Sequence, residues 1–195
     1  MSELLLTYRG MVYPWQCDHM GHMNVMWYTG KFDEASWQML ARLGLTRSYM
    51  RERNSMMAAV QQDTAFKREL HAGDIVTIRS GIIEVREKVV RFMHEMRDDG
   101  TGAVAAVSAV TGVHMDAEMR RACAFPLDFL NRARQFLSEH GPADPEEIHD
   151  TLPQRSFPPA PSKPATYPEM LYRAAGKKNC GAGRKNSWQN RTTSG

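Results

Sequence analysis

One stretch of the chain, from Val12 to Leu43, constrains the fold more than any other. The apolar segment Leu4 to Tyr13 leads into it and predicts a strand. After Gly21 the residues follow a period of about 3.6 residues, which predicts a long helix that ends at Gly44. A single carboxylate, Asp18, lies in the loop before this helix. The free N–H groups of a helix start that faces such a loop can polarise a carbonyl group.

The expected helix is amphipathic, so one face should be buried and the other solvated. The face that we expect to be buried carries Phe32, Ala35, Ser36, Met39, Leu40 and Leu43. The residues that we expect to point elsewhere are Lys31, Asp33, Glu34, Gln38 and Arg42.

The rest of the folded part reads as a short helix, a run of strands and a final helix. Thr46 to Arg53 predicts the short helix, with Thr46 as its N-cap. Alternating or β-branched patterns predict strands at Ser55–Phe66, Ile75–Val85, Val89–Arg97 and Ala103–Met115, and the amphipathic segment from Leu127 to Leu137 predicts the final helix. A long helix followed by a meander of strands predicts an α+β domain with the helix on one face of an antiparallel sheet.

Composition favours a soluble globular protein. The 195 residues are 42% hydrophobic and 24% charged, and no apolar run approaches about 20 residues, so we expect no spanning helix and no membrane partner. The start of the sequence has no signal-peptide pattern. Three cysteines, Cys17, Cys123 and Cys180, are too few for a disulfide framework and indicate a reducing, cytoplasmic location.

Charge and proline divide the chain near residue 140. Residues 1–140 hold equal numbers of basic and acidic side chains, so the net charge of +3 comes from residues 141–195. A neutral domain argues against nucleic acid as its partner. Eight of the ten prolines lie between residues 141 and 168, before a basic, Gly-rich end. We therefore expect a folded domain over residues 1–140 and an extended or disordered tail over residues 141–195.

The loop and helix also carry a family resemblance. The pattern Asp-x-x-Gly-His-x-Asn-x-x-x-Tyr, followed by Phe-Asp-Glu-Ala, consists of Asp18, Gly21, His22, Asn24, Tyr28 and residues 32–35. It resembles the 4-hydroxybenzoyl-CoA thioesterase branch of the hot-dog fold over roughly Leu4 to Met115. The resemblance implies an antiparallel sheet wrapped around a long central helix. It also implies an acyl-CoA thioesterase, which releases a carboxylate and free CoA; because CoA belongs to the substrate, no cofactor is expected.

The resemblance assigns the chemistry to Asp18 and to the start of the helix. The Asp18 carboxylate can attack the thioester carbon or deprotonate water, and the sequence does not choose between the two. Alignment with the family places the polarising backbone N–H on Val25. Asn24 either helps through its amide or serves only as the N-cap.

Three further side chains are candidates for the site. His22 could orient Asp18, hydrogen-bond the thioester or protonate the leaving thiolate; otherwise it is a helix-start histidine bonded to backbone. Trp27 and Tyr28 are expected to bind substrate by shaping the acyl pocket.

Other chemistries fit the sequence less well. Cys17, Asp18, His19 and His22 match no closed zinc pattern, so no metal is expected, and Cys17 is not favoured as a nucleophile. Lys67, Arg68, Arg86, Lys88 and Arg91 could meet the phosphates of CoA, although none is assigned.

Two alternative functions stay open. A hot-dog hydratase or dehydratase is disfavoured because Gly21-His22 continues as Met23-Asn24 rather than Phe-Pro. A non-catalytic acyl-CoA-binding module would keep the pocket without needing Asp18. Unpaired sheet edges predict that the active unit is at least a homodimer, and the resemblance extends this to a homotetramer.

Overall fold

The computed structural model describes residues 4–143 of the chain. The predicted tail lies outside the described residues from residue 144 onward.

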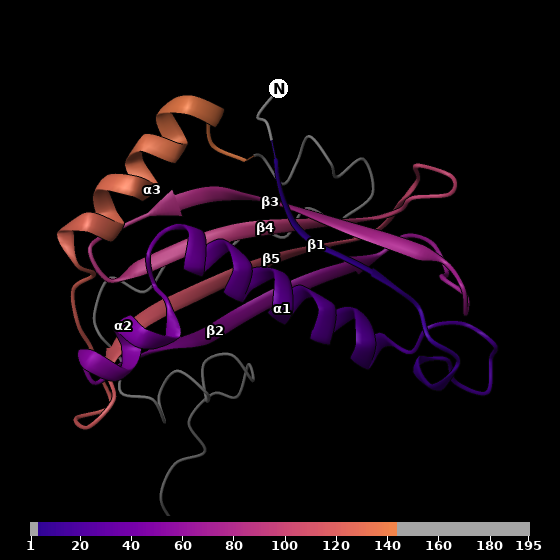
Figure 1. Ribbon diagram of the computed structural model, residues 1–195, viewed down its shortest axis with the longest axis horizontal. Coiled ribbons are helices and arrows are strands. Elements are labelled where there is room, and N and C mark those ends of the chain that lie inside the picture. The colour runs from indigo at the N-terminus through magenta and orange to yellow at the C-terminus, as the bar shows by residue number, and fades with distance from the viewer. Residues whose placement is uncertain (1–3, 144–195) are drawn as a thin grey trace, which may run out of the picture.

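The described residues form one sheet and three α-helices (Figure 1). The elements in chain order are β1 (Leu5–Met11), the 3-10 helix η1 (Pro14–Gln16), α1 (Val25–Arg42), α2 (Arg47–Glu52), β2 (Ser55–Phe66), β3 (Ile75–Val85), β4 (Val89–Asp98), β5 (Val104–Asp116), β6 (Arg121–Ala122) and α3 (Leu127–His140). The predicted strands and helices are all present, while η1 and the two-residue β6 were not predicted.

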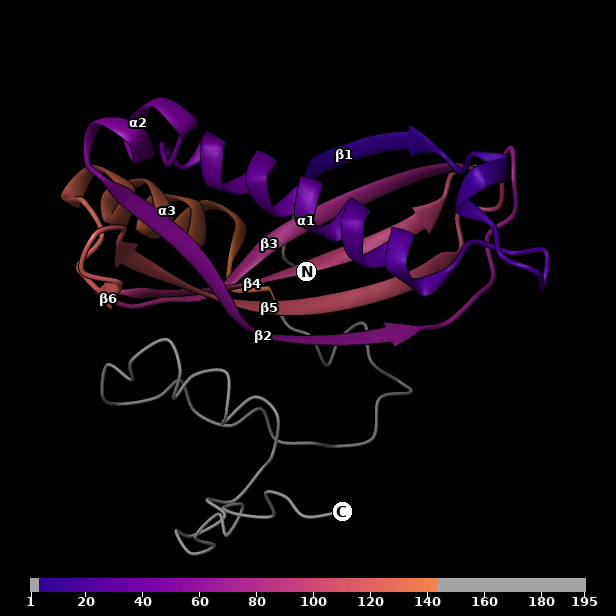
Figure 2. The same ribbon diagram turned by 90° about the horizontal axis from the view of Figure 1, so that it is seen from below.

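The sheet is antiparallel throughout and curls around α1, as Figure 2 shows from a second side. Its long strands have the order β1-β3-β4-β5-β2, and β6 pairs with β5. This is the α+β hot-dog arrangement that the sequence predicts. Among residues 4–143, no strand pairs with the outer side of β2, so β2 forms an edge of the sheet.

The core lies between α1 and the inner face of the sheet. The predicted face of α1, which comprises Phe32, Ala35, Ser36, Met39, Leu40 and Leu43, is buried. The first half of α1 packs on Val76 and Ile78 of β3, and the second half packs on Ile82 and Phe92. Burying a large apolar side chain contributes about 1.5–3 kcal/mol, so these contacts fix where α1 lies on the sheet.

Lys31 corrects one prediction, because it does not point away from the core. Its side chain is only 3% exposed. The ammonium group donates to the hydroxyl of Tyr8 at 2.9 Å and to the carbonyl oxygen of Met11 at 3.3 Å. Both acceptors belong to β1, so the periodicity of the helix alone could not reveal them.

A polar chain crosses the core beneath α1. Ser36 of α1, His94 of β4, Ser80 of β3 and Thr7 of β1 are joined by hydrogen bonds of 2.9, 2.6 and 2.6 Å. His94 is fully buried, and this burial lowers its pKa to about 3. The imidazole is therefore neutral at ordinary pH and acts as a link between helix and sheet.

The central position of β5 agrees with its sequence. Small and apolar side chains on both faces are buried, and the strand lies between β4 and β2. Within residues 4–143, no helix is both long and apolar enough to cross a membrane.

Candidate active site

A tight turn presents Asp18 immediately before α1. The N–H of Asp18 donates to the carbonyl oxygen of His22 at 3.1 Å, and the N–H of Gly21 donates to the carbonyl oxygen of Asp18 at 3.0 Å. Gly21 has a φ of +86°, in the left-handed region that favours glycine. This requirement explains the Asp-x-x-Gly spacing of the motif.

The carboxylate of Asp18 accepts two hydrogen bonds. Oδ1 accepts the backbone N–H of Met20 at 2.9 Å, and Oδ2 accepts the side-chain amide of Asn24 at 3.0 Å. These two donors, the Met20 N–H first, hold the pKa of Asp18 below its usual value of 3.8. Asp18 is therefore ionised at neutral pH, as both a nucleophile and a general base must be.

Asn24 contacts both the start of α1 and the carboxylate of Asp18. It is the N-cap of α1, since its Oδ1 accepts the N–H of Met26 at 3.0 Å. Its Nδ2 simultaneously donates to Asp18. One amide thus ties the carboxylate to the start of the helix.

Val25 is the first residue of α1, and its side chain is exposed. Its N–H belongs to the first turn, where a helix provides no acceptor of its own. Among residues 4–143, no hydrogen bond uses this N–H. It is therefore available to an external oxygen at the positive end of the helix dipole.

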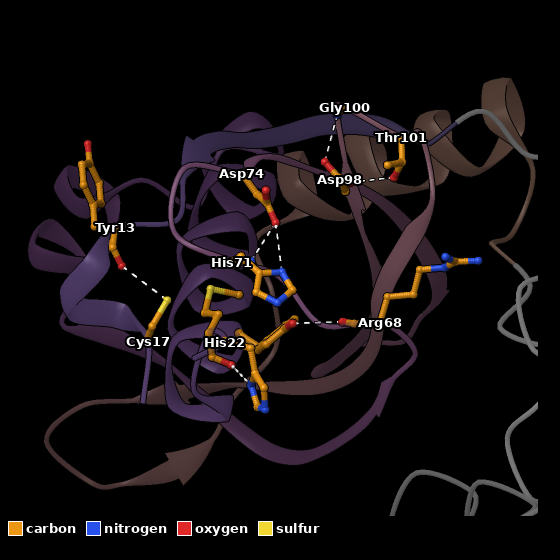
Figure 3. Close-up of polar contacts among 11 residues, drawn as sticks. Tyr13, Cys17, His22, Arg68, His71, Asp74, Asp98, Gly100 and Thr101 are labelled. Carbon is orange, nitrogen blue, oxygen red and sulfur yellow. Dashed lines mark hydrogen bonds and ion pairs between the residues drawn. The ribbon is translucent and has the colours of Figure 1, made fainter. Parts of the chain in front are cut away.

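His22 faces the loop between β2 and β3 rather than the carboxylate. Its Nδ1 lies 3.5 Å from the carbonyl oxygen of Met23 (Figure 3). Its Nε2 lies 3.8 Å from a carboxylate oxygen of Glu69. Neither ring nitrogen is hydrogen-bonded to Asp18. Sequence reasoning missed Glu69, because nothing local shows that this loop returns to the helix start.

Tyr28 is buried and braces the same loop. Its hydroxyl donates to the carbonyl oxygen of Arg68 at 3.1 Å, and its ring meets Phe66 edge-on at 5.2 Å. Burial raises the pKa of Tyr28 to about 12, so the hydroxyl stays protonated. Trp27 packs half-buried against the apolar cluster that contains Tyr28 and Phe32.

Comparison with known families places this geometry in context. The family model of the thioesterase-like superfamily matches residues 12–133, which include the turn, α1 and the whole sheet after β1. The chain belongs to the thioesterase-like superfamily.

Several known proteins resemble this superfamily member. A betainyl-CoA thioesterase of Pseudomonas aeruginosa is 24% identical over 140 residues, covering 72% of this chain and 88% of that protein. A hypothetical protein of Staphylococcus aureus, solved in complex with CoA, has a TM-score of 0.69 at 19% identity. The match covers 80% of this chain and 98% of the Staphylococcus chain. A 1,4-dihydroxy-2-naphthoyl-CoA thioesterase from Synechocystis has a TM-score of 0.60 at 16% identity. The match covers 66% of this chain and 95% of the Synechocystis chain. The two solved structures share the fold.

A cavity of about 100 Å³ lies between α1 and β2 of this superfamily member. Its lining residues are Phe32, Asp33, Ser36, Trp37, Leu40, Met57, Ala58, Ala59, Gln62, Phe92, Val110 and Gly112. None of the site residues predicted from the sequence lines it. The sequence motif did include Asp33, but only as part of the helix pattern.

The residues considered for other chemistries have the following surroundings. Within residues 4–143, no three His, Cys, Asp or Glu side chains are grouped closely enough to hold a metal ion. The thiol of Cys17 lies 3.9 Å from the carbonyl oxygen of Tyr13. Arg86 and Arg91 both form ion pairs with Glu84, which gives these two cations a structural partner.

Proposed function

We propose that this chain is an acyl-CoA thioesterase in which Asp18 is the reacting carboxylate. The observation that carries the proposal is an ionised Asp18, held by Met20 and Asn24 beside the open N-terminus of α1. Membership of the thioesterase-like superfamily supports thioester hydrolysis. The betainyl-CoA and 1,4-dihydroxy-2-naphthoyl-CoA thioesterases that resemble the chain act on different acyl groups, so they leave the acyl group open.

Two routes from the thioester to the products fit the site. In the first, an Asp18 oxygen bonds to the thioester carbon, the C–S bond breaks, and CoA leaves as a thiolate that takes up a proton. Water then cleaves the mixed anhydride and restores Asp18. In the second, Asp18 removes a proton from water as the water oxygen attacks the same carbon, and the proton passes to the leaving thiolate.

Both routes place negative charge on the carbonyl oxygen, and Val25 provides a donor for it. The backbone N–H of Val25 is fixed by the helix and needs no reorganisation during the reaction. Asn24 acts as the positioning residue, because it keeps Asp18 and the helix start in one arrangement. His22 would act on the thiolate only after leaving Met23 and Glu69, so we propose that it mainly orders the loop.

We further propose that the active unit is at least a homodimer formed through β2. An open edge strand leaves backbone N–H and C=O groups without ladder partners, and pairing with a second β2 would satisfy them. A two-fold axis makes this pairing antiparallel. Assembly of two such dimers would give the homotetramer that the family resemblance implies.

The two alternative functions make different demands on the same residues. A hydratase or dehydratase would use a histidine paired with an acid, and His22 beside Glu69 at 3.8 Å is the candidate pair for it. The continuation of Gly21-His22 as Met23-Asn24 rather than Phe-Pro disfavours that function. A non-catalytic acyl-CoA-binding module would have no need to hold Asp18 ionised at a helix start. The thioesterase uses both the ionised Asp18 and the open start of α1.

The deciding experiment is a hydrolysis panel with the full chain. Short, long, aromatic and charged acyl-CoAs are each incubated with the protein, and free thiol is measured over time. The proposal expects turnover of at least one acyl-CoA, with the carboxylate as the second product. If all of the acyl-CoAs bind without thiol release, the non-catalytic acyl-CoA-binding module replaces the thioesterase proposal.

A further inference from the structure

The cavity between α1 and β2 has a chemical character that the proposed function does not use. Its floor is apolar and aromatic, with Phe32 and Phe92 almost fully buried. A volume of about 100 Å³ is well below the 300 Å³ or so at which typical drug-sized ligand pockets begin. The cavity therefore suits a small group and excludes a long fatty chain.

Its one charged lining residue is Asp33. The carboxylate is on the exposed part of α1 and forms no hydrogen bond or ion pair with the rest of residues 4–143. No lysine, arginine or histidine lines the cavity. An unpaired carboxylate at the mouth of an apolar pocket attracts a cation and repels an anion.

The neighbours of Asp33 strengthen this preference. Trp37 lies one helical turn further along the same face, lines the cavity and is 43% exposed. An indole face attracts cations, most strongly when they are poorly hydrated. Across the cavity, the amide nitrogen of Gln62 donates to Ser108 at 3.1 Å, which leaves its carbonyl oxygen as a further acceptor.

The floor contributes no competing donor from Ser36. The hydroxyl of Ser36 donates to the carbonyl oxygen of Phe32 at 2.9 Å and, as acceptor, receives His94 Nε2 at 2.9 Å. Its proton is thus committed inside the core. The charge of the cavity is set by Asp33 alone.

We propose that this cavity receives the acyl group and selects one that is small and positively charged, with Asp33 as the specificity-determining residue and Trp37 as its aromatic wall. The inference rests on the proposed thioesterase function and names its substrate class. A compact quaternary ammonium group on a short acyl chain meets all the features of the cavity.

The position of the cavity requires the proposed dimer. Asp33 lies eight residues beyond Val25, or about 12 Å along the helix axis, too far for a short acyl group whose carbonyl oxygen bonds the Val25 N–H of the same chain. The start of α1 contacts the end of β2 through Tyr28 and Phe66, so helix and strand run in opposite directions. Two-fold pairing through β2 therefore brings the helix start of the partner towards this cavity. The carboxylate of one chain would then act on an acyl group held by the other.

The test compares two thioesters of nearly equal shape that differ in charge. Trimethylglycyl-CoA carries the quaternary ammonium group, and 3,3-dimethylbutanoyl-CoA replaces the nitrogen by carbon. We expect kcat/KM to favour the cationic thioester, and Asp33→Asn to lower that preference by about tenfold with little change for the neutral thioester. Trp37→Leu should lower it by about threefold.

Glu34→Gln is the matched control, because Glu34 is the adjacent exposed acid on α1 and does not line the cavity. It removes the same charge and should leave the preference unchanged. An equal loss of the cationic preference in Asp33→Asn and Glu34→Gln would overturn the proposed selection. Equal kcat/KM values for the two thioesters in the unmodified chain would also overturn it. Neither result would contradict the thioesterase function. Hydrolysis of neither thioester, with turnover of other acyl-CoAs, also overturns the proposed selection. Absence of any acyl-CoA hydrolysis would instead reject the proposed function.

Discussion

The side-chain amide of Asn24 donates to Asp18 Oδ2 at 3.0 Å. The other end of the same amide caps α1 by accepting the N–H of Met26. The carboxylate proposed to react and a helix N-terminus are therefore connected through one residue, so the stability of the helix and the position of the carboxylate depend on each other.

Replacing Asn24 by alanine should affect both. Loss of an N-cap typically costs about 1 kcal/mol of stability, and loss of the donor frees the Asp18 side chain. We expect a lower kcat together with a lower free energy of unfolding, measured by thiol release and urea titration. Thr46→Ala is the control, because Thr46 caps α2 by accepting the N–H of Tyr49 and touches no site residue. Equal effects of the two variants on kcat would contradict the positioning role.

The same contact predicts the acid limb of the pH profile. Hydrogen bonds from Met20 and Asn24 hold the pKa of Asp18 below 3.8. The carboxylate stays ionised as the pH falls from 7 to 5, so its protonation should not reduce kcat/KM in that range. Asn24→Ala removes one donor, raises the pKa and should move the acid limb to higher pH. An acid limb that stays in place in this variant would show that another group controls it.

Much of this domain follows from local sequence, and the rest depends on contacts that local sequence does not reveal. The period of α1 predicts its buried face, and Gly44, with a φ of +97°, ends the helix region as expected. The burial of Lys31, by contrast, depends on acceptors in β1 more than 15 residues away. The position of His22 depends on Glu69 in a distant loop.

The candidate site divides in the same way. The spacing of Asp18, Gly21 and Asn24 predicts the turn and the cap because those hydrogen bonds are local. The cavity depends on which strand faces α1, and Gln62 reaches it only through the pairing of β2 with β5. Periodicity does not reveal that pairing, so the cavity between α1 and β2 was not predicted.

His94 should make stability depend on pH. Its pKa is about 3 in the folded state and near 6.5 when the chain unfolds, so the unfolded state binds more protons between these values. The free energy of unfolding should therefore fall as the pH decreases from about 6.5 towards 3, by up to about 1.4 kcal/mol per pH unit. In urea titrations, His94→Gln should reduce this slope.

The control for that measurement is His71→Gln, since His71 is exposed in the loop before β3. In the His71→Gln variant, the change of the free energy of unfolding with pH should match that of the unmodified chain. A slope that is the same in all three proteins would contradict a neutral, buried His94.

A mixing experiment tests whether the site is shared between chains. Gly112 lines the cavity, and a side chain there would meet the methyl group of Met57, so Gly112→Leu should fill the pocket. Asp18→Asn and Gly112→Leu chains are each expected to be inactive, with folding checked by circular dichroism. Equal amounts refolded together should regain about a quarter of the full activity, because half of the dimers are mixed and each has one intact site. No recovery, with mixed dimers present, would assign each site to a single chain.

The most direct measurement of the central claim is thiol release by the Asp18→Asn chain, using the best acyl-CoA substrate of the unmodified protein. The amide keeps the shape of the side chain but can neither attack the thioester nor take a proton from water. We predict that turnover falls by at least about a hundredfold while circular dichroism and the urea midpoint stay close to those of the unmodified chain. A loss of less than about tenfold in a normally folded protein would contradict the assignment of Asp18 as the reacting carboxylate.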